Sequence, residues 1–117
     1  MRQVSVFLVE DEAFIRMMIA AMLEELGHRV VAEAGTIQDA QGMAENANFD
    51  LALLDVNLGG CSVAPVAKIL LRRALPFVVV TGYNSDALPQ SLSKSLVLQK
   101  PFVISKLNDA IATIISG

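Results

Sequence analysis

The chain has 117 residues, 54% of them apolar, and a formal net charge of −3. This length and apolar content predict one compact domain with a substantial core. The nine Lys and Arg residues are scattered among twelve Asp and Glu residues, which excludes a broad basic surface for direct binding of nucleic acid or anionic membrane. No apolar run approaches the roughly 20 residues of a membrane span, so we expect a soluble protein.

Short apolar runs alternate with segments of helical periodicity along the whole chain. Beginning with a strand, the pattern predicts alternating strands and helices over residues 4–9, 12–26, 30–33, 36–47, 51–55, 63–74, 77–81, 86–93, 96–98 and 105–116. Gly27 ends the first helix, and Thr36, with Asp39 three residues later, is typical of a helix start. Pro89 predicts that the helix over 86–93 is short or kinked. The pattern contains five strands and five helices.

Apolar strands separated by helices predict an α/β fold, in which helices cover both faces of a parallel sheet in a doubly wound arrangement. Right-handed crossovers carry every strand in the same direction, so the carboxyl ends of all strands converge on one edge of the sheet. Ligands bind at that edge in folds of this class.

Polar side chains stand at four of the five predicted strand ends. Glu10 and Asp11 follow the first strand, Asp55 ends the third, Thr81 ends the fourth, and Lys100 follows the fifth. Two carboxylates about 4 Å apart repel by roughly 4 kcal/mol at an effective dielectric near 20, so three of them need more compensation than one lysine supplies. Hard oxygen ligands with no His or Cys nearby favour Mg²⁺.

Asp55 can act as a nucleophile towards phosphorus, because carboxylates form aspartyl phosphates and a metal ion would shield the incoming anion. Lys100 would then contact a phosphoryl oxygen. The Thr81 hydroxyl could bond to another oxygen and so report whether phosphate is present. These residues together predict a chemical site that is also a switch.

Four motifs, VEDE at 9–12, LLDVN at 53–57, VVTGY at 79–83 and QKPF at 99–102, resemble those of the receiver domains of two-component response regulators, in order and spacing. The resemblance spans essentially the whole chain. It implies a flavodoxin-like fold with the strand order 2-1-3-4-5. It also implies one receiver domain over residues 1–117, with no output domain, and a cis peptide bond before Pro101.

The resemblance also implies the roles of the site residues. Asp55 would accept a phosphoryl group from a histidine kinase or a histidine phosphotransfer protein. Asp11 and Asp55 would bind Mg²⁺ directly, Glu10 through water, and Asn57 through its backbone carbonyl. The phosphate-sensing roles of Thr81 and Lys100 have the same source.

Two departures from the common receiver pattern bear on the switch. Receivers commonly carry Tyr or Phe three residues before the lysine, where this chain has Val97. Together with VVTGY, this resembles the atypical single-domain "FAT GUY" group of receivers, although Val79 and Val80 replace the Phe-Ala of that motif. Tyr83 is a candidate for the missing switch residue. Gly59 and Gly60 stand in the loop after Asp55 where many receivers have proline, so we expect a more mobile loop.

Several residues have simpler interpretations. Glu10 and Asp11 could serve as caps of the first helix. We expect His28, just after Gly27, to be an exposed turn residue without a role. Cys61 permits no internal disulfide and has no basic neighbour to lower its pKa, so a packing or loop role is favoured. We expect Phe14, Met17 and Met18 in the core, although the first helix is apolar on several sides and could expose a docking stripe.

We therefore predict a single-domain response regulator of a phosphorelay that is phosphorylated on Asp55 with Mg²⁺ as cofactor. It would signal through an unidentified downstream protein or serve as a phosphate sink. Its chemistry would be limited to self-phosphorylation and autodephosphorylation, so it is not an enzyme acting on a separate substrate. With no signal peptide pattern at its start, we expect a cytoplasmic monomer or weak dimer that binds no membrane.

Two alternatives remain at this stage. The first is a pseudo-receiver that keeps the fold as a binding module without phosphorylation, which Val97 favours and the intact acidic group opposes. The second is an aspartate-nucleophile phosphohydrolase of the haloacid dehalogenase type, which would carry a second acid where this chain has Asn57. A glycine-rich dinucleotide site is disfavoured because the first strand-helix turn is acidic.

Overall fold

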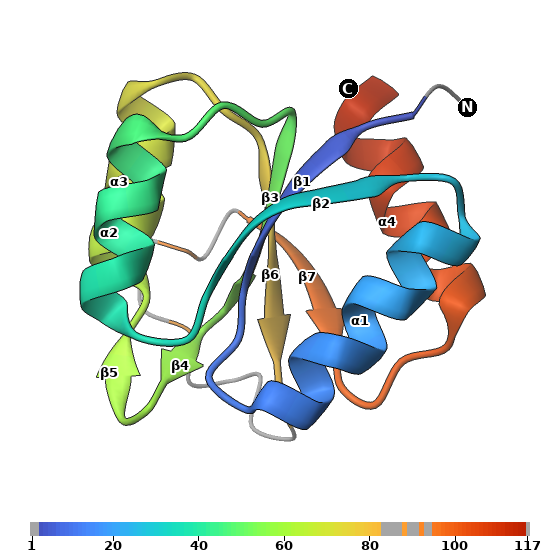
Figure 1. Ribbon diagram of the computed structural model, residues 1–117, viewed down its shortest axis with the longest axis horizontal. Helices are drawn as coiled ribbons and strands as arrows, with labels where there is room; N and C mark the ends of the chain where they lie inside the picture. Colours follow the sequence, from blue (N-terminus) through green and yellow to red (C-terminus); the bar gives the residue numbers. More distant parts are fainter. Residues whose placement is uncertain (1–2, 83–87, 89–91, 93–94, 117) are drawn as a thin grey trace.

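A computed structural model describes residues 3–82, 88, 92 and 95–116 of the chain (Figure 1). The elements in this part are β1 (Ser5–Val9), α1 (Ala13–Glu25), β2 (Arg29–Ala34), α2 (Ile37–Asn46), β3 (Leu51–Asp55), β4 (Asn57–Leu58), β5 (Cys61–Ser62), α3 (Ala64–Arg72), β6 (Phe77–Thr81), β7 (Leu96–Gln99) and α4 (Ile104–Ser116). None of the helices in these ranges is long and apolar enough to cross a membrane.

The five longer strands form one parallel sheet in the order β2-β1-β3-β6-β7. The short strands β4 and β5 pair with each other in a separate antiparallel hairpin. When the hairpin is set aside, the order of the remaining strands is the predicted 2-1-3-4-5. The flavodoxin-like α/β fold expected from the sequence is therefore confirmed.

Helices cover both faces of the sheet, α2 and α3 on one side and α1 and α4 on the other (Figure 1). Side chains of the central strands alternate between the two faces, as pleated strands require. In β3, for example, Leu54 packs in the core beneath α2 and α3, and Leu53 packs in the core beneath α1 and α4. Because β3 is buried on both faces, its sequence is apolar without alternation.

Two predicted helix boundaries have the expected hydrogen bonds. After α1, Gly27 adopts a φ of +89°, and the N–H groups of Gly27 and His28 donate to the carbonyls of Glu24 and Leu23. This pattern closes a helix end and uses a glycine because its backbone is left-handed. At the start of α2, the Thr36 hydroxyl accepts the Asp39 N–H at 3.2 Å.

One expectation about α1 is wrong, and one about residues 86–93 falls outside the described residues. Phe14 and Met17 are 74% and 69% exposed, and Met18 is 45% exposed, so the core prediction for these residues is wrong. Ile19 and Leu23 form the buried part of α1 instead, because the helix is apolar on more than one side and only one side can face the sheet. The predicted helix over 86–93 lies almost entirely outside the described residues.

His28 is also unlike its prediction, because its side chain is buried rather than exposed. Its Nδ1 accepts the backbone N–H of Val4 at 3.1 Å, just before β1 begins. Burial lowers the pKa of His28. The ring is neutral in this arrangement, since Nδ1 must keep a free lone pair to accept the bond.

Candidate functional site

Glu10, Asp55 and Lys100 meet at the carboxyl edge of the sheet. Each lies two residues beyond a leucine of the core beneath α1 and α4, so strand alternation directs the three side chains to the same side. Glu10 and Asp55 are buried, with 1% and 7% of their surface exposed. The convergence predicted from the strand ends is therefore present.

Asp11 completes an acidic cluster with Glu10 and Asp55. One carboxylate oxygen from each residue lies within 4.8 Å of the others. Asp11 is exposed, whereas the other two are buried, so the cluster is open to solvent on one side. Three carboxylates at this spacing, two of them buried, repel one another and need a positive charge.

Lys100 supplies one such charge from the end of β7. Its Nζ donates to Glu10 Oε1 at 2.6 Å and to Asp55 Oδ2 at 3.3 Å. Its backbone N–H donates to the Thr81 carbonyl at 2.7 Å, which ties the end of β7 to the end of β6. The peptide bond between Lys100 and Pro101 is cis, as expected.

The protonation behaviour of the cluster is unusual. Burial, together with the negative charge of Glu10, raises the pKa of Asp55 to about 6, although Lys100 acts in the opposite direction. Burial alone would lower the pKa of Lys100, but its contacts with Glu10 and Asp55 outweigh burial and raise it. Lys100 therefore stays charged, whereas the Asp55 carboxylate has too little positive charge around it.

Asp11 is held by the hairpin that follows β3. Its Oδ2 accepts the Gly59 N–H at 3.0 Å. Burial opposes ionisation, but hydrogen bonds from the site, including the Gly59 bond, leave the pKa of Asp11 below its usual value. The hairpin thus stabilises the charged form of the exposed carboxylate.

The loop after Asp55 is a regular tight turn, a feature that was not predicted from the sequence. Gly59 and Gly60 join β4 to β5 with φ values of +58° and +88°. Two successive left-handed residues are typical of a type I′ hairpin turn, for which a Gly-Gly pair is a known signal. The glycines are required by this turn, and Cys61 is exposed beside it.

Asn57 lies at the start of β4, two residues after Asp55. Its N–H donates to Asp55 Oδ1 at 3.3 Å, and its Oδ1 accepts the Gly60 N–H at 3.1 Å. The residue therefore links the carboxylate to the turn. That its backbone carbonyl binds a metal ion stays a prediction.

The candidate switch residues are placed less completely. Thr81 is buried at the end of β6, and its hydroxyl donates to the Gly82 carbonyl at 3.2 Å. Val97 is half-buried in β7 and lies beside Val79 in the register of the sheet. Tyr83 lies outside the described residues.

The donor set fits a magnesium ion. Glu10, Asp11 and Asp55 offer hard, charged oxygen atoms, and one side of the cluster is open for water or a phosphoryl oxygen. The raised pKa of Asp55, caused by burial and by the charge of Glu10, agrees with a site that accommodates a cation.

Residues 6–112 match the response regulator receiver domain family. The chain belongs to this family. In the flavodoxin-like sheet of this receiver, the acidic cluster and Lys100 stand at the carboxyl edge, where the fold class binds its ligands. The family prediction made from the four motifs is confirmed.

Known proteins similar to this receiver include SdrG from Sphingomonas melonis Fr1, which is 37% identical in sequence. The match has a TM-score of 0.86 and covers 97% of this chain and 97% of SdrG. The PhyR receiver domain of Erythrobacter litoralis is 26% identical, with a TM-score of 0.79, over 97% of this chain and 91% of that one. The transcriptional regulatory protein PdtaR of Mycobacterium tuberculosis is 38% identical over 95% of this chain. The receiver spans only 56% of the length of PdtaR.

Proposed function

We propose that this receiver takes a phosphoryl group onto Asp55 from a phosphohistidine of a partner protein, in a reaction that requires Mg²⁺. The observation that carries the proposal is the position of Asp55. Its carboxylate lies in a cluster of three acids, beside Lys100, with a pKa raised to about 6 by burial and by Glu10. A buried carboxylate whose charge is poorly compensated does not favour the stability of the fold. Such a perturbed group is typical of a reactive site.

The chain's own residues divide the work as follows. An Asp55 oxygen attacks phosphorus, the phosphorus–nitrogen bond of the donor breaks, and the donor imidazole keeps the electron pair. Lys100 Nζ, now shared between Glu10 and Asp55, donates to an oxygen of the transferred group. A bound Mg²⁺ would reduce the repulsion between the carboxylates and the incoming anion. Asp11, Asp55 and the Asn57 carbonyl would hold the ion directly, and Glu10 would hold it through water.

Thr81 would read the result of the transfer. Its hydroxyl is buried and donates to the neighbouring Gly82 carbonyl, so it can exchange that acceptor for a phosphoryl oxygen. The exchange would pull the end of β6 towards Asp55. Because Val97 replaces the common aromatic residue in β7, the signal would leave through the segment that follows Gly82, where Tyr83 lies.

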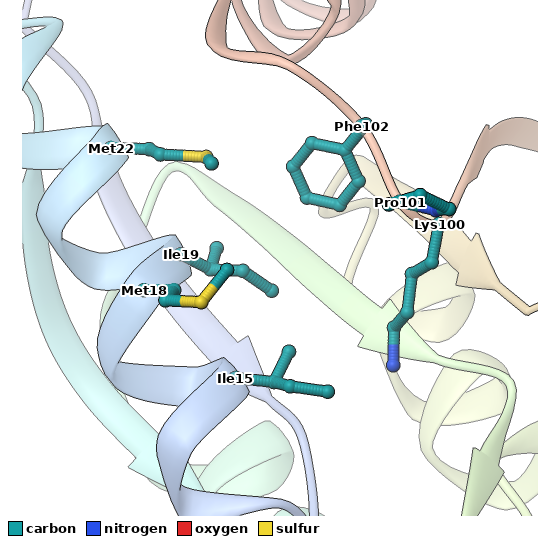
Figure 2. A pocket seen from close by; sticks show the side chains of 7 residues that line it. All are labelled: Ile15, Met18, Ile19, Met22, Lys100, Pro101 and Phe102. Atoms are coloured by element: carbon teal, nitrogen blue, oxygen red, sulfur yellow. The ribbon is translucent and has the colours of Figure 1, made fainter.

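The phosphodonor would approach beside α1. A pocket of about 130 Å³ lies between α1 and the chain after β7, lined by Ile15, Met18, Ile19, Met22, Lys100, Pro101 and Phe102. Figure 2 shows the α1 side chains facing Phe102 across this pocket, with Lys100 at its edge. Phe14 and Met17 extend the apolar surface into solvent. A histidine kinase or phosphotransfer protein that covered this surface would bring its histidine close to Asp55.

The proposal is tested by incubating the protein with acetyl phosphate and Mg²⁺ and measuring its intact mass. We expect one added phosphoryl group on the wild type and none on Asp55→Asn. Asp109→Asn is the matched control, because Asp109 is an exposed aspartate of α4 outside the cluster and should be labelled like the wild type. Equal labelling of the Asp55 variant would refute the assignment, and omission of Mg²⁺ should abolish labelling.

A second candidate is the pseudo-receiver, a binding module that is not phosphorylated. Val97 in β7 favours it, because the residue that commonly transmits phosphorylation is absent. A wild-type protein that remains unlabelled by both acetyl phosphate and a phosphohistidine donor, while still binding a partner, would establish this candidate. Function without an output domain stays a prediction.

A further inference from the structure

Arg16 contacts the backbone of the acidic site. From the first turn of α1, its Nη1 donates to the Glu10 carbonyl at 2.8 Å, and its Nε lies 3.3 Å from Glu33 Oε1 in β2. A guanidinium can reach both acceptors at once because its donors are fixed in one plane. Arg16 therefore joins the turn between β1 and α1 to the carboxyl end of β2.

Gly35, directly after β2, provides the space for this contact. A Cβ at position 35 would lie 2.9 Å from Arg16 Nη1 and 3.7 Å from the Glu10 carbonyl oxygen. The first distance is shorter than real Cβ contacts, so a side chain there would displace the guanidinium. The φ of Gly35 lies outside the left-handed range, so an alanine there would not strain the backbone, and its cost would fall on the position of the Arg16 guanidinium.

The Glu10 carbonyl belongs to the peptide group that joins Glu10 to Asp11, two members of the acidic cluster. The other polar groups of Glu10 are also engaged. Its N–H donates to the Ala34 carbonyl at 3.1 Å, and its Oε2 accepts the Glu12 N–H at 3.1 Å. Its Oε1 accepts a bond from Lys100, and its carbonyl accepts the bond from Arg16. Every polar group of Glu10 therefore has a hydrogen-bond partner. The orientation of this peptide sets where both carboxylates point.

We propose that Arg16 is a positioning residue for magnesium binding, which holds the Glu10–Asp11 peptide so that both carboxylates face the same ion, and that Gly35 makes room for it. The inference rests on the proposed magnesium-dependent function. The bond to the carbonyl carries the effect. The Glu33 side chain is 46% exposed, and an ion pair that open to solvent adds little.

The test is a Mg²⁺ titration followed through the backbone amide of Gly59 by ¹H–¹⁵N NMR, because that amide is bonded to Asp11. No phosphoryl donor is present. We expect Arg16→Ala and Gly35→Ala each to weaken Mg²⁺ binding about tenfold, as groups that orient metal ligands do. Arg16→Lys should fall close to Arg16→Ala, since Nζ of lysine is one atom closer to the backbone than Nη1 of arginine and falls short of the Glu10 carbonyl. Glu33→Gln should change the affinity less than twofold.

The decisive comparison is the double variant Arg16→Ala/Gly35→Ala. If Gly35 acts only by leaving room for Arg16, the double variant binds Mg²⁺ as Arg16→Ala does, and the two losses do not multiply. Gly42→Ala is the matched control, because a Cβ there meets nothing within 4 Å. Its affinity should equal that of the wild type. Thermal unfolding of every variant without Mg²⁺ separates lost folding from lost binding.

Three results would overturn the proposal: unchanged Mg²⁺ affinity in Arg16→Ala, full rescue by Arg16→Lys, or multiplied losses in the double variant. Each can occur while the wild type binds Mg²⁺ and is labelled on Asp55, so the proposed function would survive. A wild type that binds no Mg²⁺ would overturn both.

Discussion

Polar side chains have different partners at the two ends of the parallel sheet. At the amino end, polar groups pair with backbone: His28 accepts the Val4 N–H, and Asp50 accepts the Ser5 N–H at 2.9 Å. The Ser5 hydroxyl in turn accepts the Asp50 N–H at 2.9 Å. The bonds from Val4 and Ser5 satisfy backbone donors at the start of β1.

At the carboxyl end, charged side chains contact one another rather than the backbone. Glu10, Asp11 and Asp55 bring three negative charges together, and Lys100 contacts two of them. The pKa of Asp55 is raised, which means that its charged form is less stable in the folded chain than in the unfolded one. The hydrogen bonds at the amino end add stability, although the buried His28 Nε2 has no partner among the described residues. The poorly compensated charge of Asp55 reduces stability at the carboxyl end.

Replacing His28 should produce the largest loss of stability. His28→Ala removes the acceptor of the Val4 N–H and opens a cavity at a buried position, so we expect a loss of about 3 kcal/mol in the free energy of unfolding. Urea denaturation measures it. His28→Asn offers a side-chain oxygen close to the former Nδ1 and should recover part of the loss. An unfolding midpoint unchanged in His28→Ala would mean that the hydrogen bond and packing of His28 add nothing to the free energy of unfolding.

The matching change at the carboxyl end should have the opposite sign. Without Mg²⁺ at pH 7.5, Asp55→Asn removes a carboxylate whose charge is poorly compensated, so we expect a gain of about 1–2 kcal/mol in the free energy of unfolding. The same urea experiment on Asp109→Asn should show no change. Mg²⁺ should stabilise the wild type and have less effect on Asp55→Asn. A destabilised Asp55 variant would contradict the contrast between the two ends.

The sequence predicted the carboxyl end well and the amino end poorly, for a physical reason. Each residue of the acidic cluster ends an apolar strand or lies within two residues of its end, and parallel topology alone brings strand ends together. The role of His28 depends on Val4, 24 positions away, and no periodicity reports that contact. The fold followed from alternating strands and helices, whereas the exposure of Phe14 and Met17 depended on how α1 is rotated against the sheet.

Within the site, the missed features were those that need three-dimensional spacing. The Gly-Gly pair at 59–60 carried a hairpin signal that could have been read from the sequence. The bond from Gly59 to Asp11 spans 48 positions, and the space that Gly35 leaves for Arg16 has no local pattern. Glycine positions of this kind become interpretable only when the neighbouring side chain is known.

The smallest expected effect is the pH dependence of stability, which separates the two ends within one protein. The pKa of Asp55 is raised from 3.8 to about 6, so the destabilisation by its charge is fully present above pH 6 and disappears as the pH falls towards 3.8. The pKa of His28 is lowered, so its stabilising contribution is complete above pH 6.5 and is lost as the pH falls below that value. Between pH 6.5 and 4 the two contributions therefore oppose each other.

Urea unfolding of ion-free protein across this range should show the gain from Asp55→Asn shrinking to zero near pH 4. His28→Asn should lose stability less steeply than the wild type on acidification. A gain from Asp55→Asn that stayed constant down to pH 4 would show that the aspartate is strained by packing rather than by charge.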